Sequence, residues 1–150
     1  ISHNAGSNKM PLIGRENVQQ AMDQAKANAN KDIRGVYFSG LTALIKQTPV
    51  DEGRARNNWF LSRSSPSGEV TSSKSDSGSS SFTQLGNMPL NILNKKILFT
   101  NNLPYIETLE YGGYPNPSKG TKTAGGFSKQ APSGWARKTL KAMAKKIRSL

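Results

Sequence analysis

Among the nine carboxylates of this sequence, four could in principle carry metal chemistry: Asp51, Glu52, Glu107 and Glu110. Carboxylate oxygens are ligands that Mg²⁺ accepts, and bound Mg²⁺ can activate water in a nuclease. Each of these acids also has a simpler role, either in a turn or on a short helix. We therefore predict no metal site from them.

Other catalytic groups are scarce in the sequence. His3 is the only histidine and there is no cysteine, which excludes a histidine-based triad, a thiolate zinc site, a cysteine nucleophile and a disulfide scaffold. Residues 118–122 lack the order and spacing of a phosphate-binding loop. Because no nucleophile–base pair can be proposed, we predict that the protein is not an enzyme and uses no cofactor.

Positive charge is the stronger chemical signal. The chain has 21 Lys and Arg against 9 Asp and Glu, a net charge of +12, and no acidic residue follows Tyr111. This pattern fits a solvated basic helix as well as it fits a surface that faces DNA or an acidic protein. The candidate partner-facing or DNA-facing residues are Lys119, Lys122, Lys129, Arg137, Lys138, Lys141 and Lys145.

A long N-terminal helix must carry much of the fold. Apolar residues recur at steps of three and four over residues 15–47, which predicts one amphipathic helix that ends at the Thr48-Pro49 pair. Gly35 and Gly40 lie within it, where we expect a kink or a close helix contact. A helix of this length exceeds the globular average, so we expect it to pack against a neighbouring subunit as well as its own sheet. Residues 1–10 are predicted to be a flexible arm.

The segment after this helix is predicted to be a turn followed by a strand. Residues 50–53 suit a turn with Gly53 at positive φ, and residues 55–61 alternate in polarity with Trp59 as the apolar anchor. Arg54 and its neighbour Arg56 could contact phosphate, or one of them could pair with Asp51 and fix the turn. We favour the ion pair, since Asp51 is close in sequence.

A serine-rich segment follows, with ten serines among the eighteen residues 64–81. Such a composition buries too little apolar surface to offset its ordering entropy, which predicts a flexible loop, with a short return strand over residues 69–71. We expect deletion of Ser72–Ser80 to leave the fold intact. A short helical turn within residues 82–93 is expected to cover the core.

The last third of the chain has clearer signals. Residues 97–99 form a short apolar run, Asn101 and Asn102 favour a turn, Pro104 fits the first turn of a short helix, and Gly112 ends that helix. A final helix is predicted to begin near Ser133. Its apolar side is expected to consist of Trp135, Leu140, Met143 and Ile147.

Three segments together resemble a known family. Residues 50–59 read Val-Asp-Glu-Gly-Arg-Ala-Arg-Asn-Asn-Trp, residues 101–112 read Asn-Asn-Leu-Pro-Tyr-Ile-Glu-Thr-Leu-Glu-Tyr-Gly, and residues 130–137 read Gln-Ala-Pro-Ser-Gly-Trp-Ala-Arg. In this order they resemble the signature of the tail-completion, or head–tail joining, proteins of long-tailed bacteriophages, which are related to lambda minor tail protein Z. The residues that carry the resemblance are Asp51, Gly53, Arg54, Trp59, Asn101, Asn102, Pro104, Tyr105, Glu107, Leu109, Glu110, Gly112, Gln130, Ala131 and Pro132.

The resemblance implies a structural virion protein of the phage neck, made in the host cytoplasm. It implies a homo-oligomeric, hexameric ring around the DNA channel that joins the tail end to the head connector. Its implied partners are the tail-terminator and head-connector proteins, with non-specific contact to passing DNA and no membrane. Two alternatives stay open: a tail-terminator ring, and a basic DNA-binding module, although no helix-turn-helix, zinc finger or aromatic-studded basic groove is evident.

The fold class follows from the order of the predicted elements. We expect a single α+β domain over residues 1–150, in which a long N-terminal helix and a basic C-terminal helix pack on a small, mainly antiparallel sheet. The longest apolar stretch, residues 35–45, is too short to span a bilayer.

Overall fold

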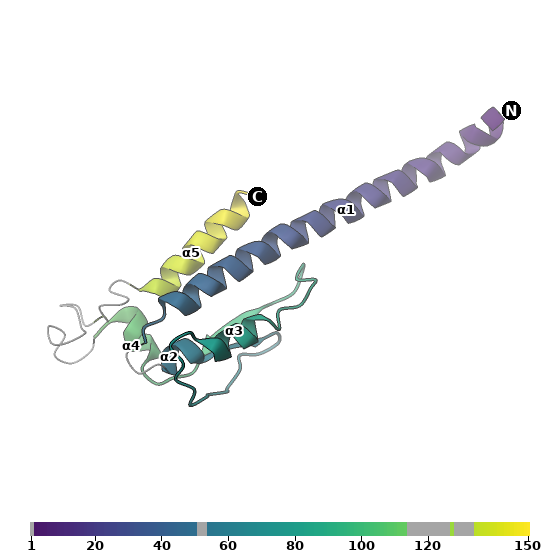
Figure 1. Cartoon of the computed structure of the whole chain (residues 1–150). Helices are drawn as coiled ribbons and strands as arrows, with labels where there is room; N and C mark the ends of the chain where they lie inside the picture. Colours follow the sequence, from purple (N-terminus) through teal and green to yellow (C-terminus); the bar gives the residue numbers. More distant parts are fainter. Residues whose placement is uncertain (1, 51–53, 114–126, 128–133) are drawn as a thin grey trace.

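A long helix, a two-stranded antiparallel sheet and a C-terminal helix form the frame of this α+β protein (Figure 1). The computed structural model describes residues 2–50, 54–113, 127 and 134–150, with side chains from residue 14 onward. The elements in chain order are α1 (Ser2–Gln47), α2 (Arg54–Asn57), β1 (Trp59–Ser62), α3 (Ser79–Leu85), β2 (Leu98–Asn101), α4 (Ile106–Tyr111) and α5 (Trp135–Arg148).

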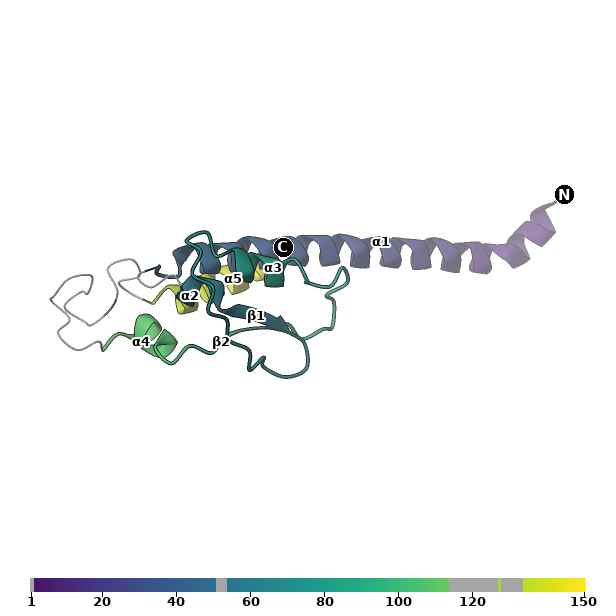
Figure 2. The same ribbon diagram turned by 60° about the horizontal axis from the view of Figure 1, so that its bottom comes forward.

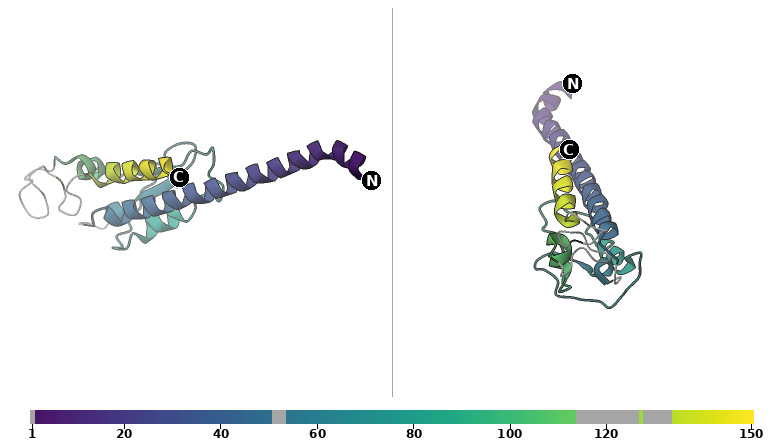
Figure 3. Two further views of the ribbon diagram at one scale, coloured as in Figure 1. Left: turned by 90° about the horizontal axis from the view of Figure 1, so that it is seen from above. Right: turned by 90° about the vertical axis from the view of Figure 1, so that its left-hand side faces the viewer.

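Helix α1 ends at Gln47, as the Thr48-Pro49 pair predicted. Its start differs from the prediction, because the helical backbone extends back to Ser2 through the residues that were expected to be a flexible arm. Every residue from 14 to 29 is exposed, so this half of α1 extends away from the rest of the described chain, as Figure 3 shows from two sides.

Asn30 is the first residue of α1 with a side-chain hydrogen bond to another described segment. The Asn30 side chain donates to the Leu90 carbonyl at 2.7 Å and accepts from the Ile92 N–H at 2.8 Å. One turn later, Arg34 Nε donates to the Pro89 carbonyl at 3.0 Å. These bonds fix the segment before β2 along α1 and explain why the helix is buried only in its C-terminal part.

Helices α1 and α5 lie side by side, and Gly40 allows their close approach, as its position predicted. A Cβ atom at Gly40 would overlap the Met143 side chain, whereas a Cβ at Gly35 would meet nothing within 4 Å. On α5, Trp135 is buried and Met143 packs against the core, but Leu140 is 59% exposed. The predicted apolar side of this helix is therefore only partly covered.

The predicted strand over residues 55–61 is corrected by the structure. Its first part is one helical turn, α2, and β1 begins only at Trp59. The Asn58 side chain donates to the Arg54 carbonyl at 2.7 Å, which closes the turn locally. Ala55 and Asn57 are buried in this helical turn. A strand would bury the same alternate residues, so the polarity pattern could not distinguish a helical turn from a strand.

The two strands place two aromatic rings on one face. Trp59 lies opposite Asn101 and Leu61 opposite Phe99, so Trp59 and Phe99 are diagonal neighbours. Their rings stack with centroids 5.5 Å apart and planes 12° apart. Trp59 is buried, which confirms it as the anchor of the sheet, and Figure 2 shows the strands on one side of the α1–α5 pair.

Helix α3 covers the outer edge of β1. The Trp59 N–H donates to Ser81 Oγ at 3.0 Å, and the Leu61 N–H donates to Gln84 Oε1 at 3.2 Å. Ser81 is fully buried and donates onward to the Arg56 carbonyl at 2.7 Å. The side chains of α3 thus satisfy N–H groups that a third strand would otherwise bond.

The serine-rich segment lacks regular structure over residues 63–78, as predicted, but it is bonded to buried residues. Asn57 Nδ2 donates to the Ser75 carbonyl at 2.6 Å. Asn58 Nδ2 donates to the Thr71 carbonyl at 3.0 Å, and the Thr71 N–H donates back to Asn58 Oδ1 at 2.8 Å. The predicted return strand over residues 69–71 is wrong, and residues 79–81 belong to α3, while the flexibility of the loop stays a prediction.

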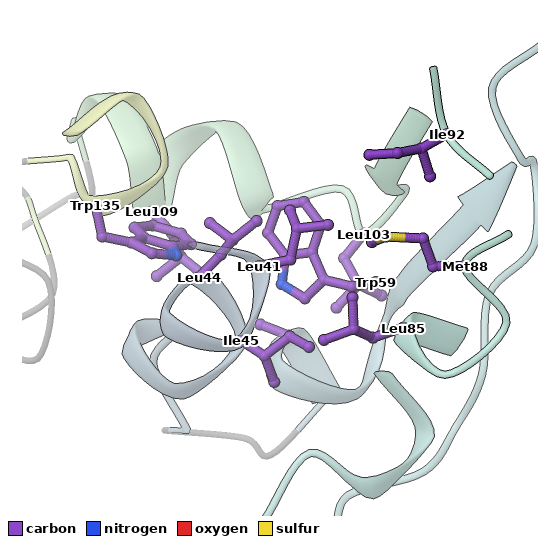
Figure 4. Close-up of a cluster of buried hydrophobic side chains, with 11 residues drawn as sticks. Leu41, Leu44, Ile45, Trp59, Leu85, Met88, Ile92, Leu103, Leu109 and Trp135 are labelled. Atoms are coloured by element: carbon purple, nitrogen blue, oxygen red, sulfur yellow. The ribbon is translucent and has the colours of Figure 1, made fainter. Parts of the chain in front are cut away.

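The hydrophobic core lies where the C-terminal part of α1 meets the sheet, α3, α4 and α5 (Figure 4). Ile45 is its most buried member, with no exposed surface. The cluster consists of Leu41, Leu44, Ile45, Ala55, Trp59, Leu85, Met88, Ile92, Leu103, Leu109 and Trp135.

Candidate interaction surface

Residues from the first and third signature segments meet at a single hydroxyl. Thr48 Oγ1 accepts the indole N–H of Trp59 at 3.0 Å and the indole N–H of Trp135 at 3.2 Å. The same hydroxyl donates to the Leu44 carbonyl at 2.7 Å, so its hydrogen-bonding capacity is fully used. Because all three side chains are buried, this arrangement joins α1, β1 and α5 rather than offering a free group to a ligand.

The two asparagines of the central segment hold two different parts of the chain. Asn101 Nδ2 donates to the Ala55 carbonyl at 2.9 Å, and its Oδ1 accepts from the Leu103 N–H at 3.2 Å. Asn102 Nδ2 donates to the carbonyls of Ser67 and Glu69, at 2.6 and 3.0 Å. Asn101, predicted to lie in a turn, is the last residue of β2, and the two asparagines connect this strand end to α2 and to the serine-rich loop.

Glu110 binds the N-terminus of α5. Its carboxylate accepts from the backbone N–H groups of Ala136 at 3.0 Å and Arg137 at 3.1 Å, which are otherwise unsatisfied at a helix start. The α5 N-cap is Gly134, at a φ of 77°, while the predicted cap Ser133 lies outside the described residues. Glu110 is therefore a structural carboxylate, whereas Glu107 on the same helix is exposed.

Arg137 was predicted to face a partner, but its guanidinium already has neighbours within the chain. Its Nε lies 3.7 Å from Glu110 Oε2, and its Nη2 donates to the Glu110 carbonyl at 3.2 Å. It also lies 4.3 Å from the centroid of the Tyr111 ring, a cation–π contact. Part of the side chain remains exposed, so Arg137 both fixes α4 against α5 and contributes charge to the surface.

Arg56 binds the C-terminus of α1. Its guanidinium donates to the carbonyls of Thr48 at 3.0 Å, Lys46 at 2.7 Å and Asp76 at 2.7 Å. Desolvation by burial lowers the pKa of Arg56, and the Asp76 carboxylate opposes that shift. The arginine stays protonated at neutral pH all the same. Asp51 and Gly53 lie outside the described residues, so the predicted Asp51 ion pair remains a prediction.

The exposed basic residues gather on α5. Lys138, Lys141, Lys145 and Arg148 are all exposed, and at about 100° per residue they share one side of the helix with Arg137. We call these five residues the basic face. The other predicted partner-facing residues, Lys119, Lys122 and Lys129, lie outside the described part of the chain, as do the signature residues Gln130, Ala131 and Pro132.

Several residues that build this region gave little signal in the sequence. Thr48 was expected only to end a helix, and Ser81 only to belong to a loop. Asn57 and Asn58 are fully buried, although asparagine is mostly exposed in proteins. The available sequence signal for these contacts was the pair of adjacent asparagines directly before the Trp59 anchor. The side-chain amide of a buried asparagine needs several hydrogen-bond partners, so such a pair indicates contacts with other segments.

The structure is an α+β protein in which residues of the three signature segments bind one another. Its exposed features are the basic face of α5 and the N-terminal half of α1. Within the described ranges, no group of acidic or histidine side chains could hold a metal ion, and no helix is both long and apolar enough to cross a bilayer. Comparisons with protein-family models, curated proteins and solved structures find no match to this chain.

Proposed function

We propose that this protein is a structural component of the neck of a long-tailed bacteriophage, where a ring of subunits joins the tail end to the head connector around the DNA channel. The observation that carries the proposal is the convergence of the three signature segments. Asn101 in the second segment donates to the Ala55 carbonyl in the first. Glu110 in the second segment accepts from the backbone N–H groups of Ala136 and Arg137 in the third. Such contacts are what the resemblance implies if the three segments form one structural unit.

The exposed half of α1 supports subunit association. Val18 is 59% exposed and Met22 is 49% exposed, and they lie one turn apart on the same side of the helix. Ala25 and Ala29 continue this apolar stripe and are exposed as well. A ring subunit must present apolar surface to its neighbours, and this stripe is a candidate for that contact.

A paired substitution tests the subunit contact. Val18→Glu with Met22→Glu places two carboxylates on the stripe, and Gln20→Glu with Gln24→Glu adds the same charge to another side of the helix. We expect sedimentation to show an oligomer, formed alone or with isolated phage tails, that the first pair abolishes and the second retains. A wild-type chain that stays monomeric even with tails would contradict the ring.

The basic face favours a second candidate, a free DNA-binding module. Both functions predict DNA binding at low salt, because a net charge of +12 attracts any polyanion. A ring around a channel must let DNA pass, so we expect non-selective binding that fades near physiological salt. Tight, selective binding by a monomer would favour the module, and electron microscopy of assembled particles would locate the ring.

A further inference from the structure

The outer edge of β2 presents hydrogen-bonding groups to the surroundings. The N–H groups of Trp59 and Leu61 point away from β2, toward α3, which makes Phe60 and Thr100 the hydrogen-bonded pair between the strands. Since antiparallel strands alternate, the N–H and C=O groups of Phe99 and Asn101 point away from β1.

The two edges of the sheet differ in whether their outward backbone groups have hydrogen-bond partners. The edge of β1 is satisfied by α3, but within the described ranges no donor or acceptor meets the outward backbone groups of Phe99 and Asn101. Folded proteins usually cover or obstruct such an edge, and a sheet of two strands gains stability from a third. The β2 edge is thus an unpaired template for an extended segment.

An apolar groove lies beside this edge, on the face that carries Trp59 and Phe99. Its volume is about 280 Å³, and Leu140, which is largely exposed, forms part of its wall. Every second side chain of a strand added to β2 would lie on this face. The groove is lined by Tyr37, Leu41, Leu44, Trp59, Ile97, Phe99, Ala136, Thr139, Leu140 and Met143.

Charge decides what kind of segment fits. Lys95 and Lys96 are exposed directly before β2, and Arg137 and Lys141 lie on the turns of α5 next to Leu140. A second copy of this chain would bring the same positive surface, with a net charge of +12, to this site. A segment with carboxylates beside its apolar residues would instead be attracted.

We propose that the β2 edge binds an extended segment of a partner protein, which adds as a third strand, places alternate apolar side chains in the groove and pairs its acidic residues with the surrounding cations. This mode of recognition obtains affinity from main-chain hydrogen bonds and specificity from the groove. The inference rests on the sheet and the groove, and it holds whether or not the protein belongs to a phage neck.

A synthetic peptide tests the edge directly. The probe is a short peptide of alternating valine and threonine with a glutamate at each end, and the readout is amide hydrogen exchange of the wild-type protein followed by NMR. We expect the Phe99 and Asn101 amides to exchange freely alone and to be protected at least tenfold by saturating peptide. Protection that is already present without peptide and rises with protein concentration would show that a second copy occupies the edge, and would overturn the proposal.

Variants and a modified peptide test the edge and the groove. Phe99→Pro removes an outward N–H and also the Phe99 ring from the groove, so we expect peptide affinity to fall at least tenfold. Leu140→Lys closes the groove at an exposed position and should lower affinity about threefold. Leu90→Lys, at a residue 82% exposed and outside the groove, is the matched control and should leave affinity unchanged. A peptide N-methylated at alternate residues should not bind; equal binding of the methylated peptide would refute strand addition even if Phe99→Pro failed to fold.

Discussion

Trp59 and Trp135 donate their indole N–H groups to the same oxygen, the hydroxyl of Thr48. The hydroxyl sits just beyond the end of α1, and the two rings come from β1 and α5. One threonine therefore fixes the relative positions of three elements whose residues are distant in sequence, and both indole donors depend on it because they are buried.

Thr48→Val should destabilise the protein strongly. The substitution keeps the shape but leaves two buried indole N–H groups without their acceptor, at roughly 1–3 kcal/mol each, so we expect a loss of about 2–6 kcal/mol in the free energy of unfolding. Urea unfolding followed by tryptophan fluorescence measures it. Thr48→Ser keeps the oxygen and should lose far less; equal losses for both variants would show that the methyl group, not the hydroxyl, matters.

Glu110→Gln should weaken the start of α5. The charged carboxylate accepts two backbone N–H groups and lies beside Arg137, so its neutralisation should lower the free energy of unfolding by about 1–2 kcal/mol. Glu107→Gln, on the same short helix but exposed, should change it by less than about 0.5 kcal/mol. Thermal unfolding by circular dichroism compares the two, and a larger loss for the exposed position would contradict the assigned role.

Gly35 and Gly40 should respond in opposite ways to alanine. Gly35→Ala adds a methyl group in open space within a helix, which should stabilise the protein by about 0.5–1 kcal/mol. Gly40→Ala gains the same helix propensity but forces the Met143 side chain to move, so its net effect should be smaller or negative. The melting temperatures of both variants test this prediction. Equal stabilisation would mean that α5 packs less closely against α1 than it does in the structure.

Deletion of Ser72–Ser80 should unfold or severely weaken the protein, contrary to what composition suggests. The deletion removes the Ser75 carbonyl that Asn57 Nδ2 binds and the Asp76 carbonyl that Arg56 Nη1 binds, so both side chains lose a hydrogen bond. It also removes the first two residues of α3. We expect a loss of more than about 2 kcal/mol. Replacing the exposed Ser72 and Ser77 with alanine keeps the backbone and serves as the control; a cooperative, wild-type-like melting curve for the deletion would refute this prediction.

Local signals in the sequence predicted part of the fold well. Proline after Thr48 fixed the end of α1, the apolar run before Asn101 predicted β2, and Gly112, at a φ of 82°, ends α4 as expected. Each of these rests on a residue whose own backbone or side chain restricts the chain nearby. Such restrictions can be read without knowing what the residue will contact.

Contacts between distant segments were not predictable in this way. The alternation before Trp59 suited a strand, but Asn58 closes a helical turn there and binds Thr71 in a loop whose composition indicated disorder. Likewise, Glu110 was recognised as part of a motif, yet its role depends on where α5 begins. The partner of a polar side chain depends on which segments the fold brings near it, and the sequence pattern does not show which segments these are.

The exposed N-terminal half of α1 extends beyond the part of the protein that contains the hydrophobic core. Residues 14–29 extend roughly 24 Å at about 1.5 Å per residue, and all of them are exposed. Substitutions there should leave the melting of the body nearly unchanged while they alter what the helix touches. If this half of α1 makes the proposed subunit contact, a genetic screen should find assembly-defective variants there that fold normally.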